Sequence, residues 1–208
     1  MAISTTTLLS FLLTCIVIEI TPGPNMAYLA IVAATHGRRT GWMATLGIAC
    51  GLLMLGLAAA FGLATLVLKY SILYETLRWC GVAYLLWLAW EGWTEAEGSA
   101  PEDATHPIDN ATYFWRGLVT NLLNPKAALF FLSVLPDFVD LSRSILPQTV
   151  SLSIVYVLVA TTIHATIVAL AGTASNLLAR PDDMRMLRRT LSALLAIIAL
   201  WLAYATAR

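Results

Sequence analysis

The chain has 208 residues, of which 59% are hydrophobic and 12% charged, with a formal net charge of +0 at pH 7. A soluble globular domain carries roughly 25% charged residues, about twice this share. The mean hydropathy of +0.79 points the same way. Composition therefore excludes an ordinary soluble domain and predicts an integral membrane protein.

Six apolar segments are long enough to cross a bilayer, since a helical span takes roughly 20 residues. They cover residues 7–34, 42–68, 72–90, 117–136, 149–178 and 190–207. The third begins with Glu75 and Arg78, which we expect at the membrane interface. The first has no basic stretch before its apolar run, so we expect it to be retained rather than cleaved as a signal peptide. The predicted fold is an all-α membrane protein with six transmembrane helices.

The first span is interrupted by residues that are costly inside a membrane unless they face a cavity or another protein group. They are Glu19, Thr21, Pro22, Gly23, Pro24 and Asn25. Proline lacks an amide donor and clashes with the preceding turn, which leaves nearby carbonyls without helical partners. The half-helix that follows can present free N–H groups and the positive end of its dipole. This segment therefore predicts a functional site.

The second and third spans contain small residues in apolar runs. Gly47-x-x-x-Gly51 spacing lets helices approach closely, either within one bundle or between the two copies of a homodimer. Cys15, Cys50 and Cys80 show no paired spacing. We expect them to be small buried hydrophobic residues, neither metal ligands nor a disulfide framework.

Residues 91–116 are rich in Glu, Asp, Ser, Ala, Pro and Gly and predict a solvated acidic linker. The linker separates a first repeat at residues 1–90 from a second at residues 117–208. The first span of the second half is also interrupted, at Asn121, Asn124, Pro125 and Lys126. Because each half has three spans, two halves of the same fold must cross the membrane in opposite directions. Inverted repeats with matching helix breaks are typical of transporters whose substrate site lies near the midplane.

Loop charges predict the orientation, because cytoplasmic loops carry an excess of Lys and Arg. One side has seven, at Arg38, Arg39, Arg116, Arg180, Arg185, Arg188 and Arg189, and the other has four, at Lys69, Arg78, Arg143 and Arg208. We therefore expect the linker inside the cytoplasm and both termini outside it.

Two facing breaks would form a zwitterion-sized polar site. Free amides, with Asn121 or Asn124, suit a carboxylate, while Glu19, Asn25 or freed carbonyls suit an ammonium. Simpler interpretations stand beside this one. The prolines occur in membrane helices as packing kinks, and the asparagines as interhelical hydrogen-bonding groups. Glu19 and Lys126 could form a structural ion pair. His164 is either a core histidine or, like Glu19, a proton carrier.

Four motifs in order resemble the lysine exporter (LysE/RhtB) family. They are TPGPN at residues 21–25, Gly47-x-x-x-Gly51, AYLLWL at residues 83–88, and NLLNPKAALFF at residues 121–131 followed by Pro136. The resemblance covers nearly the whole chain. It implies a bacterial inner-membrane exporter of amino acids or close derivatives, driven by the proton gradient, in a family whose members carry lysine, arginine, threonine, homoserine and others.

Carried over position by position, the resemblance implies functional roles for Thr21, Pro22, Gly23, Pro24, Asn25, Asn121, Asn124, Pro125 and Lys126. Two positions depart from the family pattern. Leu52 stands where many relatives have a polar residue, and Glu19 is not a constant of the pattern. Both departures bear on coupling and on the substrate.

The predicted mechanism is alternating access, in which an amino acid binds between the broken first and fourth spans and a proton moves inward on Glu19 or His164. The expected partners are an amino acid and the lipid bilayer, without nucleic acid, cofactor, metal ion or catalytic residues. One alternative is a cation or metal-ion exporter, for which Glu19 and one histidine are a thin ligand set. The other is an intramembrane enzyme, although the spans show no catalytic pair or metal-binding motif.

Overall fold

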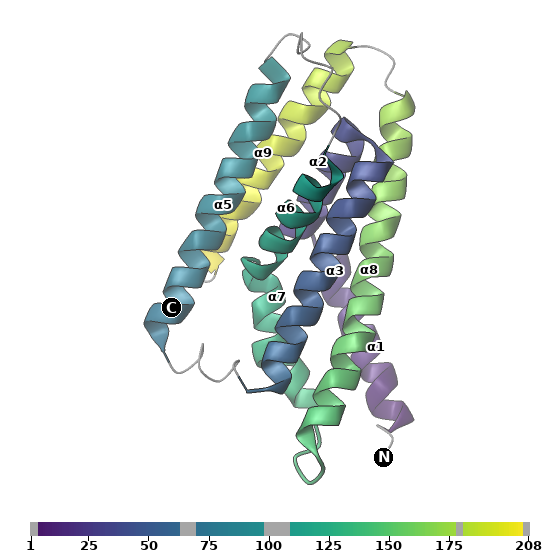
Figure 1. Cartoon of the computed structure of the whole chain (residues 1–208), viewed down its shortest axis with the longest axis vertical. Coiled ribbons are helices and arrows are strands. Elements are labelled where there is room, and N and C mark those ends of the chain that lie inside the picture. Colours follow the sequence, from purple (N-terminus) through teal and green to yellow (C-terminus); the bar gives the residue numbers. More distant parts are fainter. Residues whose placement is uncertain (1–3, 63–69, 98–108, 178–180, 206–208) are drawn as a thin grey trace.

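The computed structural model describes residues 4–62, 70–97, 109–177 and 181–205, and these are helical with short connections. Figure 1 shows an elongated bundle of near-parallel helices. The α-helices are α1 (Thr5–Ile20), α2 (Pro24–His36), α3 (Arg38–Ala60), α5 (Ser71–Glu97), α6 (Asn110–Leu122), α7 (Pro125–Leu129), α8 (Ile145–Leu177) and α9 (Pro181–Ala205). A π-helical turn, η1 (Phe130–Val134), and a 3-10 turn, η2 (Leu135–Phe138), continue α7. The prediction of an all-helical chain is confirmed for the described residues.

Both predicted helix breaks are present. The axis bends by 58° between α1 and α2 and by 49° between α6 and the segment that starts at Pro125. In each case a proline is the first residue of the second helix. At this position an amide N–H would have no acceptor within the helix, so the missing N–H of proline costs no hydrogen bond. The α1–α2 pair and the α6–α7 pair run in opposite directions along the bundle (Figure 1).

Helix α3 packs against α6 and α8. A Cβ atom on Gly47 would overlap the backbone carbonyl of Phe114, and one on Gly117 would overlap the carbonyl of Ala44. A Cβ on Gly51 would lie 2.8 Å from Nδ2 of Asn121. The Gly47-x-x-x-Gly51 motif therefore serves contact within the bundle, between α3 and α6, and brings α3 against the second helix break.

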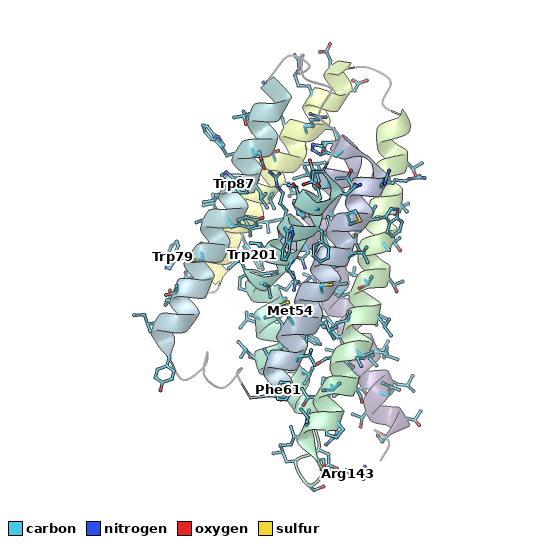
Figure 2. The ribbon with its side chains drawn as sticks, viewed as in Figure 1. Met54, Phe61, Trp79, Trp87, Arg143 and Trp201 are labelled. Atoms are coloured by element: carbon cyan, nitrogen blue, oxygen red, sulfur yellow. The ribbon has the colours of Figure 1, made fainter. Side chains whose placement is uncertain are left out.

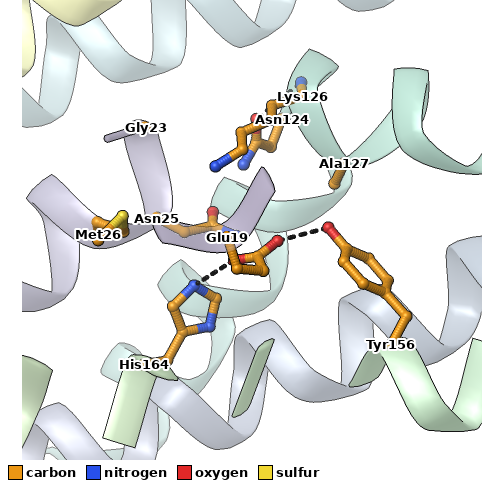
Figure 3. A pocket seen from close by; sticks show the side chains of 9 residues that line it. All are labelled: Glu19, Gly23, Asn25, Met26, Asn124, Lys126, Ala127, Tyr156 and His164. Atoms are coloured by element: carbon orange, nitrogen blue, oxygen red, sulfur yellow. Dashed lines mark hydrogen bonds and ion pairs between the residues drawn. The ribbon is translucent and has the colours of Figure 1, made fainter. Parts of the chain in front are cut away.

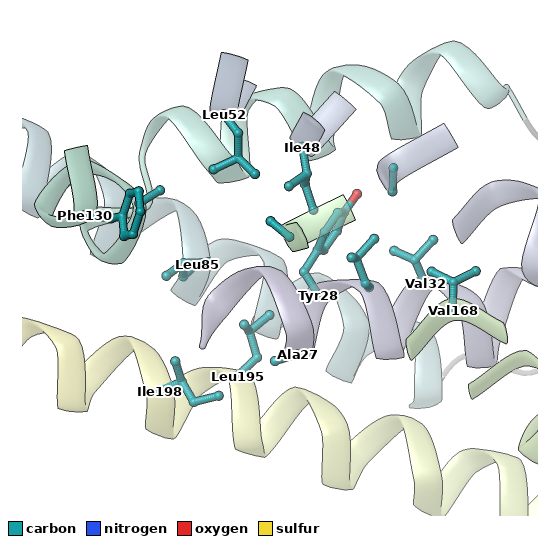
Figure 4. Close-up of a cluster of buried hydrophobic side chains, with 14 of the residues drawn as sticks. Ala27, Tyr28, Val32, Ile48, Leu52, Leu85, Phe130, Val168, Leu195 and Ile198 are labelled. Atoms are coloured by element: carbon teal, nitrogen blue, oxygen red, sulfur yellow. The ribbon is translucent and has the colours of Figure 1, made fainter. Parts of the chain in front are cut away.

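The core is a continuous cluster of buried apolar side chains contributed by the helices around α2 and α3, including Tyr28, Ile48, Leu52, Phe130 and Leu195 (Figure 4). Leu52, which departs from the family pattern, is 1% exposed in this cluster. The position thus serves packing here, with no polar group to contribute to a site.

Large apolar side chains also cover the outside of the bundle. Leu13 is 65% exposed, Val17 67% and Leu158 61%, and Met54, Phe61 and Trp79, labelled in Figure 2, are exposed as well. An apolar surface of this extent marks contact with lipid or another apolar partner. By length and composition, α3 and α8 can each cross a membrane, and the described residues hold up to four such spans if each bent pair counts as one.

The third and sixth predicted spans correspond to α5 and α9, which pack against each other but do not meet that criterion. Both helices carry charged residues, among them Glu75, Arg78, Asp182 and Arg185.

The cysteine prediction was wrong in part: Cys15 is buried, but Cys50 and Cys80 are exposed. An apolar environment outside the bundle removes the need to bury a small hydrophobic residue.

The predicted linker, residues 91–116, is partly helical. Helix α5 continues to Glu97 and α6 begins at Asn110, while residues 98–108 lie outside the described part of the chain. Asp109 caps α6 by accepting hydrogen bonds from Thr112 Oγ1 and the Ala111 amide, which lower the pKa of its carboxyl below the ordinary value. Arg116 pairs with Glu91 through two hydrogen bonds of 2.8 Å. Both residues of this ion pair lie in helices, α5 and α6, within the segment that composition assigned to solvent.

Candidate functional site

A narrow polar pocket lies where the two helix breaks meet (Figure 3). Its lining residues come from the end of α1, the start of α2, the start of α7 and the middle of α8. They are Glu19, Gly23, Asn25, Met26, Asn124, Lys126, Ala127, Tyr156 and His164. Six of the residues singled out from the sequence are in this set, drawn from both halves of the chain.

Glu19 is held by two residues of α8. The hydroxyl of Tyr156 donates a hydrogen bond of 2.5 Å to Oε1 of Glu19, and Nε2 of His164 lies 3.4 Å from Oε2. Glu19, Tyr156 and His164 are at most 5% exposed. Both proton-carrier candidates are thus neighbours, and neither ring nitrogen of His164 has a hydrogen-bond partner among the described residues. A carboxylate and an imidazole in contact can share or exchange one proton.

Two hydrogen bonds join the breaks directly. Nδ2 of Asn25 donates to Oδ1 of Asn121 over 2.9 Å, and Nζ of Lys126 donates to the carbonyl oxygen of Thr21 over 2.7 Å. Thr21 follows the last residue of α1, so the Lys126 ammonium lies at the negative end of that helix dipole. Within the described part of the chain, Oδ1 of Asn25 and Nδ2 of Asn121 remain buried without partners. Such atoms are costly unless a ligand or water satisfies them.

The two breaks differ in how their second helices are capped. Asn124 accepts a hydrogen bond of 3.0 Å from the amide of Lys126 and caps α7. Gly23 precedes α2 without any side-chain cap. The first-turn amides of α2, at Asn25 and Met26, therefore lack the side-chain acceptor that α7 has. This makes the N-terminus of α2 the better place for a carboxylate.

A larger, mainly apolar cavity adjoins the polar pocket, and both are lined by Gly23 and Lys126. Thr21, Pro22 and Pro24 line this cavity rather than the polar pocket. Asn121 lines neither and is hydrogen-bonded to Asn25, and Pro125 lies buried at the start of α7. The sequence candidates thus divide into pocket residues, cavity residues and residues that shape the break.

The simpler alternative of a Glu19–Lys126 ion pair was wrong, because Lys126 bonds to a carbonyl while Glu19 contacts Tyr156 and His164. Sequence reasoning missed Tyr156 altogether. The one feature of the sequence that could have indicated Tyr156 is its hydroxyl group, two turns before His164 on the same apolar helix. Within the described residues, no three His, Cys, Asp or Glu side chains gather into a metal-binding group, so the geometry does not favour the alternative of metal-ion export.

Apolar outer faces, two bent helix pairs and a polar pocket between the bends define a helical membrane protein with an internal polar pocket. The comparison with protein families agrees with this class. The model of the LysE type translocators matches residues 16–206. The chain belongs to the LysE type translocator family.

The chain is similar in sequence to several bacterial membrane proteins. The homoserine/homoserine lactone efflux protein of Salmonella typhi is 26% identical over 94% of this chain and 95% of its own length. The leucine efflux protein of Enterobacter sp. (strain 638) is 32% identical over 61% of each chain. An uncharacterized membrane protein of Vibrio cholerae is 25% identical over 87% of this chain and 88% of its own length. No solved structure matches significantly.

Proposed function

We propose that this protein exports a neutral amino acid, or a close derivative, across the bacterial inner membrane by proton-coupled alternating access. The observation that carries the proposal is the pocket between the breaks, which offers complementary groups to both ends of a zwitterion. Its lining includes an ammonium at Lys126, the uncapped start of α2, a carboxylate at Glu19 and an unpartnered oxygen on Asn25. The names of the efflux relatives support the same class of substrate.

In this proposal the substrate carboxylate binds the first-turn amides of α2 and Nζ of Lys126. The substrate ammonium binds Oδ1 of Asn25 and the Glu19 carboxylate. Lys126 already bonds the Thr21 carbonyl, so substrate binding exchanges one partner for another at the joint between the breaks. Such an exchange links occupancy of the site to the angle of the breaks.

Six spans arranged as inverted three-helix repeats give this site two routes of access. The opposite directions of the two bent pairs support that arrangement (Figure 1). Arg116 ties α6 to α5 through Glu91, and Arg188 donates to the Thr35 carbonyl over 3.3 Å. These contacts lie at the end that we propose is cytoplasmic and support a conformation closed there. Rocking of one repeat against the other would break them.

The function is tested by reconstituting the purified protein in proteoliposomes loaded with a panel of labelled amino acids. We expect efflux of at least one neutral amino acid to accelerate when a proton gradient is imposed and to collapse when an ionophore dissipates it. Liposomes without protein give the background. Efflux indistinguishable from that background for the whole panel would refute the proposed function.

The orientation predicts which loops face the outside of the cell. In a chain with Cys15, Cys50 and Cys80 changed to Ala, Ser142→Cys between η2 and α8 should react with an impermeant maleimide added to intact cells. Asp109→Cys, at the start of α6, should react only after permeabilisation. The reverse pattern would contradict the orientation, and equal reactivity at both positions would contradict a fourth span that crosses the membrane between them.

A further inference from the structure

The cavity beside the polar pocket is built for an apolar group. Its apolar walls come from α1, the segment that follows the second break, and α9, and include Ile18, Leu129, Phe130, Val134 and Trp201. Its cavity volume is about 470 Å³, against about 10 Å³ for the narrow polar pocket. Among its described lining residues, Lys126, which also faces the polar pocket, is the only charged one. A cationic side chain would find no carboxylate among the lining residues.

The cavity adjoins the proposed zwitterion site. Gly23 and Lys126 line both spaces, and a Cβ on Gly23 would lie 3.2 Å from Cδ of Lys126. The Lys126 side chain therefore packs over Gly23 at the junction between the two spaces. When Lys126 exchanges the Thr21 carbonyl for the substrate carboxylate, a substrate held between Lys126 and Glu19 would direct its side chain past Gly23 into the apolar cavity.

The helix that forms one wall is locally irregular. Residues Phe130–Val134 form a π-helical turn, which adds a residue to the turn and is frequently found at functional sites. This turn supplies Phe130, Ser133 and Val134 to the cavity. The Phe130 ring stacks on Tyr156 at 3.6 Å between centroids, and Tyr156 is the residue that bonds Glu19. The cavity wall and the proposed proton site are thus in direct contact.

Resting on the proposed export function, we propose that this cavity is the side-chain subsite and selects an amino acid with a large apolar side chain, such as leucine, methionine or phenylalanine. Basic amino acids are excluded because the cavity offers them no counter-charge. Small hydroxylated ones are disfavoured because they leave the apolar walls unfilled. The occupant is the substrate side chain rather than a lipid tail, because the cavity shares Gly23 and Lys126 with the polar pocket.

Counterflow into proteoliposomes preloaded with unlabelled substrate tests the subsite. We expect labelled leucine or phenylalanine to exchange about tenfold or more faster than homoserine or lysine, since each missing methylene in an apolar pocket costs roughly tenfold or more. Val134→Trp should fill the cavity and slow leucine while sparing alanine. Ser133→Asp should add the missing carboxylate and raise lysine exchange about tenfold. Leu158→Trp, on the exposed face of α8, is the matched control and should leave the preferences unchanged.

The outcomes distinguish failure of the proposed function from failure of the proposed subsite. If no amino acid exchanges at all, the proposed function fails. If amino acids exchange but homoserine or lysine is as fast as leucine, the function stands and the subsite is overturned. The same conclusion follows if Val134→Trp slows alanine and leucine equally, or if neither variant changes the preference, which is the result expected for a lipid-filled groove. Because Ser133 is exposed, its variant keeps the test usable if Val134→Trp does not fold.

Discussion

Glu19→Gln should lower proton-driven export by about 100-fold, equivalent to ~2.7 kcal/mol in the transition state, while leaving exchange of substrate across the membrane measurable. The amide keeps the shape of the side chain and can still accept the hydrogen bond from Tyr156. It cannot accept and release a proton. The measurement is paired: efflux under an imposed proton gradient, and counterflow without one, in the same proteoliposomes.

The contacts of Glu19 supply the matched variants. Tyr156→Phe removes one hydrogen bond of 2.5 Å from Glu19 but leaves the carboxyl in place, so export should continue with a shifted pH profile. Glu75→Gln changes a carboxylate on α5 that pairs with Arg78 outside the site and should leave export unchanged. Wild-type export in Glu19→Gln would exclude Glu19 as the carrier and transfer the role to His164.

The same variant distinguishes a proton-carrier role of Glu19 from a purely structural role. If Glu19 only satisfies His164 and Tyr156, Glu19→Gln should impair both efflux and counterflow and lower the thermal stability of the protein. A carrier role predicts loss of efflux alone. His164→Gln distinguishes a shared proton from a single carrier, since a shared proton requires both residues and a single carrier at Glu19 tolerates the change.

The helix breaks could be predicted from sequence because proline and glycine act locally. Two prolines around Gly23 and one at Pro125 leave no continuous helix, whatever surrounds them. Glu19 and His164 could be selected because an ionisable group in an apolar run is conspicuous by itself. Their mutual contact could not be predicted, since it depends on how α8 packs beside the end of α1.

The residues that sequence reasoning missed or misplaced depend on packing between distant segments. Tyr156 is an ordinary amphipathic side chain until its hydroxyl meets Glu19, 137 positions away. The apolar cavity is assembled from α1, η1 and α9, each unremarkable in its own stretch of sequence. The ends of the linker were assigned to solvent on composition, but the pairing of Glu91 with Arg116 and the cap at Asp109 favour longer helices there.

Removing the break between α1 and α2 should also have one of the largest effects on transport. Replacing Pro22, Gly23 and Pro24 with alanine should straighten the 58° bend, because in a helix interior alanine is favoured over each proline by about 3 kcal/mol and over glycine by about 1 kcal/mol. The opposing contacts, Lys126 to the Thr21 carbonyl and Asn25 to Asn121, contribute about 1 kcal/mol each. The helix preference is larger, so the site between the breaks should be lost.

We therefore expect the triple alanine variant to insert into the membrane in normal amounts and to show neither efflux nor counterflow. Spin labels at positions 13 and 30, on either side of the break, should move apart relative to the parent protein. Leu9→Ala with Val17→Ala is the matched control, since both side chains are exposed on α1 and their loss leaves the break intact. Transport at the parent rate in a straightened variant would mean that the bend, and the uncapped start of α2 that it creates, has no part in binding.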